Sequence, residues 1–235
     1  MRLDRFLSMS GVMTRREAER AARAGRIFVN GLPERSASRQ IDPAVDRVAF
    51  DGEEIEYREN YFIMINKPGG YVSSTKDPRD RTVLELLPER LHRLSLFPCG
   101  RLDKDTTGLL LLTSNGSLAH RLLSPRRQVE KKYRFECSRP LSDEDRAALE
   151  AGVLLADGYR TLPATVELDA GRTSGIITIH EGKYHQIKRM FGALGDNRIL
   201  SLERTQFGPL SLDPTLPPGG WRYLSPDEVA QLEGL

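Results

Sequence analysis

The densest group of residues that could do chemistry lies at positions 99–108, with the sequence Cys-Gly-Arg-Leu-Asp-Lys-Asp-Thr-Thr-Gly. The apolar run Leu109–Leu112 follows directly, as is typical of a strand buried on both faces. Polar residues at the end of a rigid core strand are a common position for catalysis. Asp103 and Asp105 could form a carboxylate pair, as in glycoside hydrolysis, unless the loop holds their side chains apart.

A simpler interpretation of this segment stays open on the residues alone. In a structural turn, Asp103 and Thr106 would accept hydrogen bonds from backbone N–H groups, and Gly108 would supply a positive φ. Composition and spacing slightly favour this turn over a catalytic site.

The motifs of the common cofactor-dependent and hydrolytic enzymes are missing from the sequence. It contains no G-x-G-x-x-G after a strand, no G-x-x-x-x-G-K-[ST], no H-E-x-x-H and no G-x-S-x-G. The four histidines are scattered, and Cys99 and Cys137 form no Cys/His cluster. We therefore expect no metal and no cofactor, and any reaction would use carboxylates and cations.

Positive charge is concentrated at the N-terminus. Nine arginines and four acidic residues give the first forty residues a net charge of +5, whereas residues 41–60 carry −5. Four of these arginines fall on a helix expected after the N-cap Thr14, namely Arg15, Arg16, Arg20 and Arg23. Because the planar guanidinium suits phosphate, this pattern favours an RNA-contacting face over a merely solvated one. The whole chain of 235 residues has 35 basic and 33 acidic side chains, so it is nearly neutral because its positive and negative segments cancel.

Hydrophobic periodicity predicts an α+β protein in two parts. Two short helices, a strand ending at the Asn30-Gly31 turn and a second strand over 47–50 come first, and we interpret the acidic stretch 53–60 as a linker. From Tyr61 onward strands outnumber helices, without the regular βαβ alternation of a doubly wound nucleotide fold.

Two segments of the second part have clear periodicity. Alternation over 129–137 predicts a half-buried strand. A stripe of large apolar side chains predicts a helix ended by Gly195, and its members are Tyr184, Ile187, Phe191 and Leu194.

Two stretches of the sequence resemble known families. Residues 1–50 resemble the S4 RNA-binding domain in their order of arginine-rich helix, Gly-Arg, strand and Val-Asn-Gly. From Tyr61 to the C-terminus the chain resembles the RsuA/RluA pseudouridine synthases, on four motifs: Gly100–Thr113, Asn66–Gly69, Lys132-Tyr133 and Glu181–Phe191. The S4-like module points to the RsuA branch, and so do three further stretches, Tyr71–Pro78, Ser124–Arg126 and Pro218–Ser225.

The resemblance implies a fold and a reaction. It implies a small S4-like (αL) domain with its linker over 1–58 and a catalytic domain over 59–235, whose mixed, mainly antiparallel central sheet is flanked by helices. The implied reaction isomerises uridine to pseudouridine in ribosomal RNA. The N1–C1′ bond breaks, the freed uracil turns, and it is rejoined through C5 with no cofactor. The expected target is uridine 516 of 16S rRNA.

The resemblance also assigns roles to individual residues. Asp103 is the catalytic carboxylate, which attacks C1′ of the ribose or C6 of uracil, or takes the 2′ proton. Lys188 pairs with this carboxylate, because desolvation alone would raise the pKa of the carboxylate. Tyr133 stacks on the uracil and Ile187 closes the pocket. Arg101 fills the gap that the flipped-out uridine leaves.

Supporting and RNA-gripping residues complete the expected site. We expect Lys67 and Pro68 to shape the site, and Thr106 and Thr107 to brace the Asp103 loop by hydrogen bonds. A second basic block, with a net charge of +5, spans positions 121–134. It contains one acidic residue, Glu130, and six cations, namely Arg121, Arg126, Arg127, Lys131, Lys132 and Arg134. Because this block adjoins Tyr133, we interpret it as a phosphate track.

The N-terminus lacks the apolar stretch of a signal peptide, and no apolar run approaches the roughly 20 residues that span a bilayer. We expect a cytoplasmic monomer with no membrane contact, whose partner is small-subunit rRNA or an assembly intermediate. Two alternatives are a 23S rRNA pseudouridine synthase of the same branch and a non-catalytic S4-type ribosome-associated RNA-binding protein. The combination of Asp103, Tyr133 and Lys188 favours an enzyme.

Overall fold

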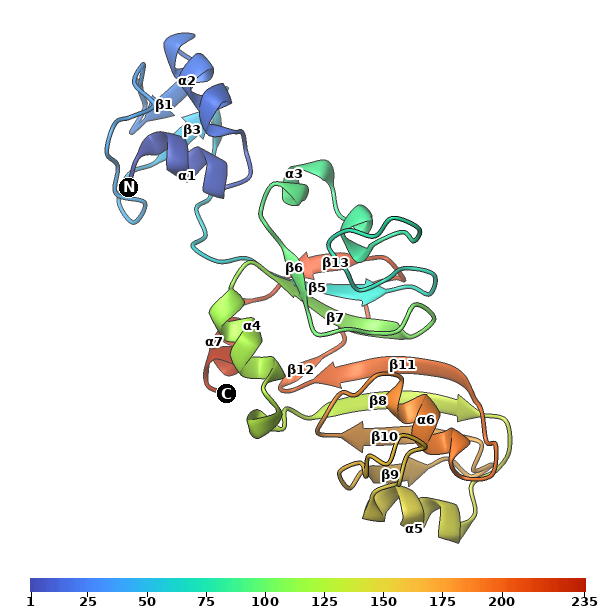
Figure 1. Cartoon of the computed structure of the whole chain (residues 1–235). Helices are drawn as coiled ribbons and strands as arrows, with labels where there is room; N and C mark the ends of the chain where they lie inside the picture. Colours follow the sequence, from blue (N-terminus) through green and yellow to red (C-terminus); the bar gives the residue numbers. More distant parts are fainter. The chain divides into compact units, whose positions relative to one another are not determined.

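The computed structural model describes residues 1–235 (Figure 1). It contains two compact units, Met1–Tyr61 with Leu87–Leu96, and Phe62–Leu86 with Phe97–Leu235. The domain boundary expected from the sequence, between residues 58 and 59, assigned Leu87–Leu96 to the second domain, whereas the structure assigns it to the first unit. In the structure Gly11, at φ +73°, leaves space for the Leu94 side chain, so this segment packs with the first unit.

The first unit contains two helices, a four-stranded sheet and a short helical return. Helices α1 (Leu3–Met9), α2 (Arg15–Arg23) and α3 (Glu89–His92) accompany a sheet of order β2-β1-β3-β4, with bounds Leu32–Pro33, Ile27–Val29, Val48–Phe50 and Glu53–Glu54. Thr14 caps α2 in a capping box with Glu17, as expected. The linker prediction is wrong at its start, because Glu53 and Glu54 pair with β3 after the turn at Asp51-Gly52.

The second unit is built on a nine-stranded mixed sheet of order β13-β5-β7-β11-β8-β10-β9, with β6 on β7 and β12 on β11. The strands are β5 (Phe62–Lys67), β6 (Phe97–Cys99), β7 (Thr107–Thr113), β8 (Lys131–Cys137), β9 (Thr165–Leu168), β10 (Ser174–Ile179), β11 (Ile199–Phe207), β12 (Leu210–Ser211) and β13 (Trp221–Tyr223). Every pairing is antiparallel except that of β7 with β11. The predicted α+β fold with a mainly antiparallel central sheet is confirmed.

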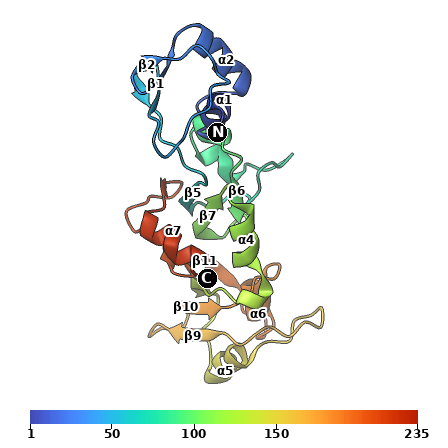
Figure 2. The ribbon, with the colours of Figure 1, turned by 90° about the vertical axis from the view of Figure 1, so that its left-hand side faces the viewer.

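Helices and short helical turns cover this sheet. They are η1 (Val83–Leu86), α4 (Gly116–Leu123), η2 (Pro125–Arg127), α5 (Asp143–Ala151), α6 (Gln186–Gly192) and α7 (Pro226–Glu233). Helices α4 and α7 lie close together at one end of the sheet (Figures 1 and 2). Leu122 of α4 and Leu232 of α7 share a buried cluster with Leu111 of β7, so these two helices seal the core around β7. None of the helices has the length and hydrophobicity needed to cross a membrane.

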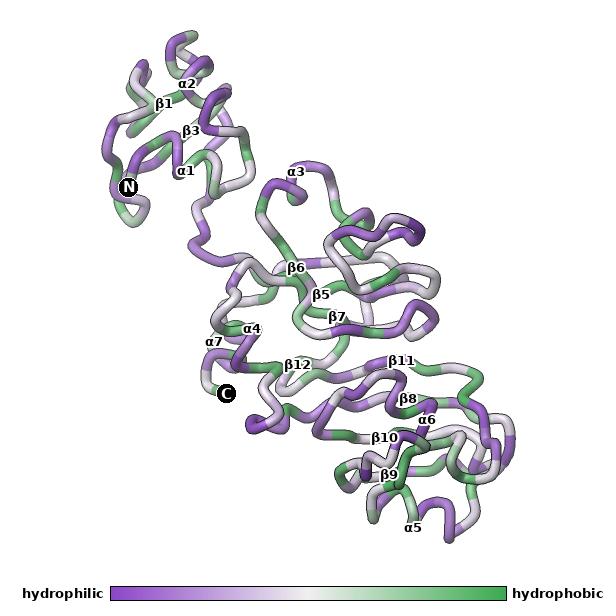
Figure 3. The backbone as a smooth tube through the Cα atoms, in the orientation of Figure 1, coloured by the Kyte–Doolittle hydropathy of each residue, from purple (hydrophilic) through white to green (hydrophobic).

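Strand β7 carries the apolar run that the sequence placed in the core. Leu109–Leu112 are completely buried, and the tube of Figure 3 changes from hydrophilic in the preceding loop to hydrophobic along β7. At Gly108, with φ +95°, a Cβ atom would lie 2.3 Å from the carbonyl oxygen of Arg204. Glycine therefore allows the close approach of β7 to β11, the junction between the two halves of the sheet.

The helix predicted from the stripe at 184–194 is shorter than expected. It is α6, which begins at Gln186 and ends at Gly192, so Tyr184 lies outside it and is 77% exposed. Ile187 and Phe191 are buried, as the stripe predicted. Tyr184 matches the helical period by spacing alone, because His185 adopts a left-handed φ of +47° that interrupts the helix before it.

Candidate active site

The loop that precedes β7 brings two carboxylates to one ammonium group. Lys188 Nζ on α6 lies 3.1 Å from Asp103 Oδ2 and 2.5 Å from Asp105 Oδ1. The loop bends at 104–105, and the backbone N–H of Thr106 donates to the carbonyl oxygen of Asp103 at 3.2 Å. The loop therefore does not hold the two Asp side chains apart, and both carboxylates contact the same ammonium.

These contacts hold Lys188 and Asp105 in their charged forms. Burial lowers the pKa of Lys188, but hydrogen bonds to Asp105 and Asp103 outweigh it and raise that pKa above 10.5. Burial raises the pKa of Asp105, but the bond from Lys188 outweighs it and lowers that pKa below 3.8. The side chain of Asp103 is 24% exposed and that of Asp105 is 74% exposed. Asp103 is thus the more enclosed carboxylate.

Lys67, at the end of β5, anchors this loop. Its fully buried ammonium donates to three carbonyl oxygens, those of Thr106 at 2.7 Å, Pro68 at 3.1 Å and Lys104 at 3.2 Å. Burial lowers the pKa of Lys67 to about 8, against the opposing effect of the Asp105 and Asp103 charges. Two of the three acceptors belong to the loop that follows Asp103, so Lys67 ties that loop to the sheet. The shaping role expected for Lys67 and Pro68 stays a prediction.

The two threonines act differently from expectation. The buried hydroxyl of Thr106 has no hydrogen-bond partner, and that of Thr107 donates to the carbonyl oxygen of Leu202 on β11 at 3.4 Å. The prediction that these hydroxyls brace the Asp103 loop is therefore wrong. The backbone of Thr106 and the ammonium of Lys67 make those contacts instead.

Tyr133 and Ile187 are buried near the same end of the sheet. Tyr133 on β8 is in register with Arg204 on β11, and Arg204 is in register with Gly108 on β7. With neighbouring strands about 4.8 Å apart, Tyr133 and Gly108 are separated by about 10 Å across the sheet. Ile187 immediately precedes Lys188 on α6 and is 4% exposed. The strand register thus places Tyr133 within reach of the region that the Asp103 loop borders.

Two residues at this site were not predicted from the sequence. His185 Nε2 lies 3.5 Å from Asp103 Oδ1, although the histidines looked scattered. Arg204 is 1% exposed, donates from Nε to the Leu109 carbonyl oxygen and leaves Nη2 without a partner. The spacing of His185 three residues before Lys188 was a usable signal, but nothing local marks Arg204 as buried. No three His, Cys, Asp or Glu side chains converge as a metal site would require.

The basic block at 121–134 is only partly a surface track. Arg126 and Arg127 on η2 are exposed, as is Arg134 on β8, and Lys132 forms an ion pair with Glu130 at 3.6 Å. Lys131 does not belong to the track, because its ammonium turns inward to the Val129 carbonyl oxygen at 2.7 Å. Arg101 is exposed beside the Asp103 loop.

On the first unit, the arginines of α2 divide into two kinds. Arg15 donates to the buried carboxylate of Asp4, which Arg2 also holds, so Arg15 has a structural contact. Arg16, Arg20 and Arg23 are exposed. A groove of about 440 Å³ runs beside α2, and its lining includes Arg20, Arg26 and Arg93. Arg26 and Arg93 are paired with Asp51 and Glu17, so fewer exposed arginines are free of acidic partners than the nine in the sequence suggested.

Comparison with known proteins places these observations in a family. Residues 61–193 match the model of the RNA pseudouridylate synthase family, and residues 1–46 match that of the S4 domain. The chain belongs to the RNA pseudouridylate synthase family. An uncharacterized RNA pseudouridine synthase of Bacillus subtilis, YtzG, is 44% identical, with 97% of each chain covered. Ribosomal small subunit pseudouridine synthase A of Vibrio cholerae is 40% identical, with 99% of each chain covered.

A solved structure agrees with these relatives. A crystal structure of a pseudouridylate synthase superposes with a TM-score of 0.70 at 37% identity, over 99% of each chain. The protein is thus a pseudouridine synthase of the RsuA branch, an isomerase with an N-terminal S4 domain, as the sequence resemblance implied.

Proposed function

We propose that this pseudouridine synthase isomerises one uridine of small-subunit ribosomal RNA, uridine 516 of 16S rRNA, with Asp103 as the catalytic carboxylate. The substrate class is supported by the relatives of Vibrio cholerae and Escherichia coli, both 40% identical, which are named ribosomal small subunit pseudouridine synthase A. The observation that carries the role of Asp103 is its ion pair with Lys188 at 3.1 Å, on a loop that Lys67 anchors.

The proposed chemistry uses these groups in sequence. The target uridine leaves its stack and enters the site, where the ionised Asp103 attacks C1′ or C6 of uracil or takes the 2′ proton. Lys188, whose ammonium lies 3.1 Å from Asp103 Oδ2, supplies the opposite charge beside this carboxylate. Once the N1–C1′ bond is broken, the ring of Tyr133 holds the free uracil by stacking while it turns to present C5. Exposed Arg101 occupies the place that the base has left.

The exposed cations are proposed to bind the RNA backbone. Arg16, Arg20 and Arg23 on α2, and Arg126 and Arg127 on η2, would contact phosphates. Because the two groups lie on different units, the S4 unit would contribute affinity and the second unit would contribute orientation at the site.

The test compares two carboxylates that share one partner. Asp103→Asn and Asp105→Asn each remove one charge beside Lys188, so both alter the same ion pair. We expect Asp103→Asn to abolish pseudouridine formation with RNA affinity within a few-fold of wild type, and Asp105→Asn to retain measurable turnover. Pseudouridine is mapped across both ribosomal RNAs in a strain whose only copy is the variant. Full modification with Asp103→Asn would refute the catalytic assignment, and a missing modification in 23S rRNA would refute the small-subunit target.

A further inference from the structure

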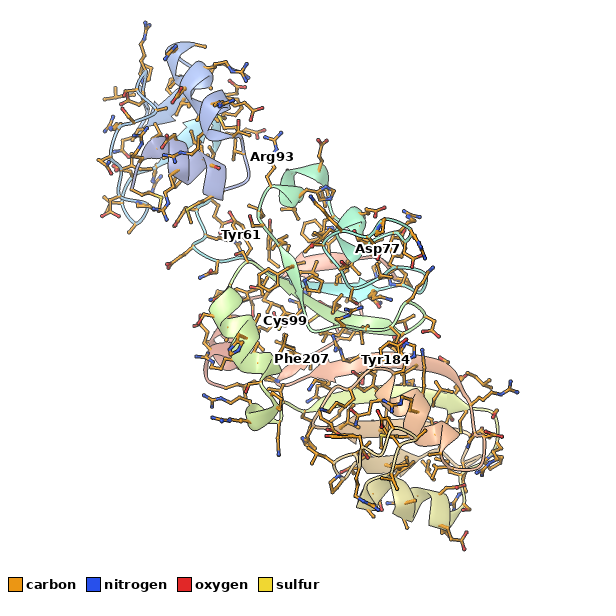
Figure 4. All side chains as sticks on the ribbon, viewed as in Figure 1. Tyr61, Asp77, Arg93, Cys99, Tyr184 and Phe207 are labelled. Carbon is orange, nitrogen blue, oxygen red and sulfur yellow. The ribbon has the colours of Figure 1, made fainter.

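An exposed aromatic pair stands at the edge of the site. The Tyr184 side chain is 77% exposed, and its ring is stacked on that of His185 with centroids 3.8 Å apart and planes 17° from parallel. Figure 4 shows Tyr184 on the segment between β10 and α6. An aromatic ring left in water forgoes the burial that normally places it in a core. Its exposure therefore suggests a ligand that covers it.

The segment that carries the pair is held rigidly from inside. Gln186, 4% exposed, accepts from the backbone N–H of Lys183 at 2.9 Å and donates to Glu181 Oε1 at 2.8 Å. Glu181 in turn accepts from the Tyr159 hydroxyl at 2.6 Å. The Tyr184 carbonyl oxygen accepts from Arg189 Nη1 at 3.3 Å, so the backbone is fixed on both sides of the ring. A rigid aromatic surface loses little conformational entropy when a ligand covers it.

The pair begins directly beside the proposed catalytic carboxylate. His185 Nε2 lies 3.5 Å from Asp103 Oδ1, and the Tyr184 ring is stacked on the His185 ring at a centroid distance of 3.8 Å. A flat group resting on Tyr184 would thus lie close to, but outside, the space that a uridine at Asp103 occupies.

We propose that the Tyr184–His185 pair is a stacking platform for one unpaired base of the RNA, adjacent in sequence to the target uridine. The proposal rests on the proposed function, because it takes the RNA strand at Asp103 as the source of the base. Unpaired bases are bound by stacking on aromatic side chains irrespective of base identity, which suits an exposed aromatic ring. The platform would hold the strand in register while the uridine leaves its stack.

The experiment is a thermodynamic cycle between protein and RNA. The RNA is an rRNA fragment centred on the uridine that the wild-type protein modifies, and single abasic nucleotides replace the two neighbours on each side in turn. Single-turnover kinetics give the apparent Kd and the rate constant for wild type, Tyr184→Ala, Tyr184→Phe and Tyr184→Trp. Leu200→Ala is the control, because Leu200 is an exposed apolar side chain (66%) of the same unit, on β11.

Loss of stacking is expected to weaken binding at one RNA position. Tyr184→Ala should raise the apparent Kd for intact RNA roughly tenfold, and one abasic substitution should do the same to wild type. Together they should cost little more than either alone, whereas Tyr184→Phe and Tyr184→Trp should restore wild-type affinity and Leu200→Ala should change nothing.

Two results would overturn the platform. One is equal abasic costs in wild type and Tyr184→Ala at all four positions, and the other is unchanged affinity of Tyr184→Ala for intact RNA. An error in the proposed target is distinguishable from failure of the platform, because the wild-type protein would then modify a uridine other than 516. The scan is then centred on that uridine.

Discussion

The Nε of Arg204 on β11 donates a hydrogen bond to the carbonyl oxygen of Leu109 on β7 at 2.7 Å, inside the core. This bond spans the one parallel pairing of the sheet, where Arg204 is in register with Gly108. The Asp103 loop runs into β7, and Tyr133 on β8 pairs with β11. The junction therefore sets the separation between the proposed catalytic carboxylate and the proposed stacking ring.

Arg204→Met keeps most of the side-chain volume and removes this bond. Loss of a hydrogen bond from a charged donor destabilises the folded state by about 1.5–3 kcal/mol. Removal of a buried cation whose Nη2 has no partner offsets part of this loss, so we expect the free energy of unfolding to fall by about 1 kcal/mol. Because the loop and Tyr133 lose their fixed separation, kcat should fall about tenfold with KM little changed. Urea unfolding and steady-state kinetics measure the two effects, and a wild-type kcat would exclude a positioning role.

Lys188→Met leaves Asp103 and Asp105 side by side without a cation. Loss of this electrostatic partner should lower the single-turnover rate about 100-fold, whereas Lys188→Arg should recover part of it by keeping the charge. The raised pKa of Lys188 and the lowered pKa of Asp105 keep this pair charged between pH 3.8 and 10.5. Its contribution is lost only as pH falls through the lowered carboxyl pKa or rises through the raised ammonium pKa. The ratio of wild-type to Lys188→Met rates should thus stay constant from pH 6 to 9, and a ratio that falls toward one at pH 9 would contradict it.

Lys131→Met should stabilise the protein at neutral pH. Burial lowers the pKa of Lys131 from 10.5 to about 8, so below pH 8 the folded state bears the full cost of the buried charge. Between pH 8 and 10.5 the unfolded chain binds more protons than the folded one, so wild-type stability rises with pH. The variant should be more stable by about 1 kcal/mol at pH 7, with the advantage shrinking by pH 10.

Urea unfolding at the two pH values tests the Lys131 prediction. Arg134→Met is the matched control, because Arg134 is an exposed cation on the same strand. An advantage of Lys131→Met that is equal at pH 7 and 10 would show that packing, rather than the buried charge, is responsible.

Arg20→Gln combined with Arg23→Gln should weaken RNA binding without affecting the reaction step. Each phosphate contact that is lost reduces the slope of log K against log salt by about 0.7 to 0.9, so two contacts reduce it by roughly 1.5. The single-turnover rate at saturating protein should stay at its wild-type value. Arg146→Gln on α5 is the control, because its guanidinium is paired with Glu150 at 3.0 Å. An unchanged slope in the double variant would show that the exposed face of α2 does not contact RNA.

Local pattern was sufficient for some elements of this protein, β7 and α2 among them, and for the position of its reactive loop. The run Leu109–Leu112 is typical of a strand buried on both faces, and the structure confirms it. Thr14 and Glu17 indicate a helix start because the side chain of each accepts a hydrogen bond from the backbone N–H of the other. The motif around Asp103 likewise needed no structure to be recognised as a candidate.

Contacts between residues that are distant in the sequence could not be predicted from local pattern. Asp103 and Asp105 face one ammonium only because the loop bends and α6 brings Lys188 to it across 83 to 85 positions. Arg204 looks like a surface cation by composition, yet it is 1% exposed in the core. Tyr184 looks like a core residue by its period, yet the left-handed backbone of His185 excludes it from the helix and leaves it exposed. Periodicity reports the average environment of a face, whereas the direction of a single side chain depends on which strand or helix lies opposite, and that is settled only when the chain has folded.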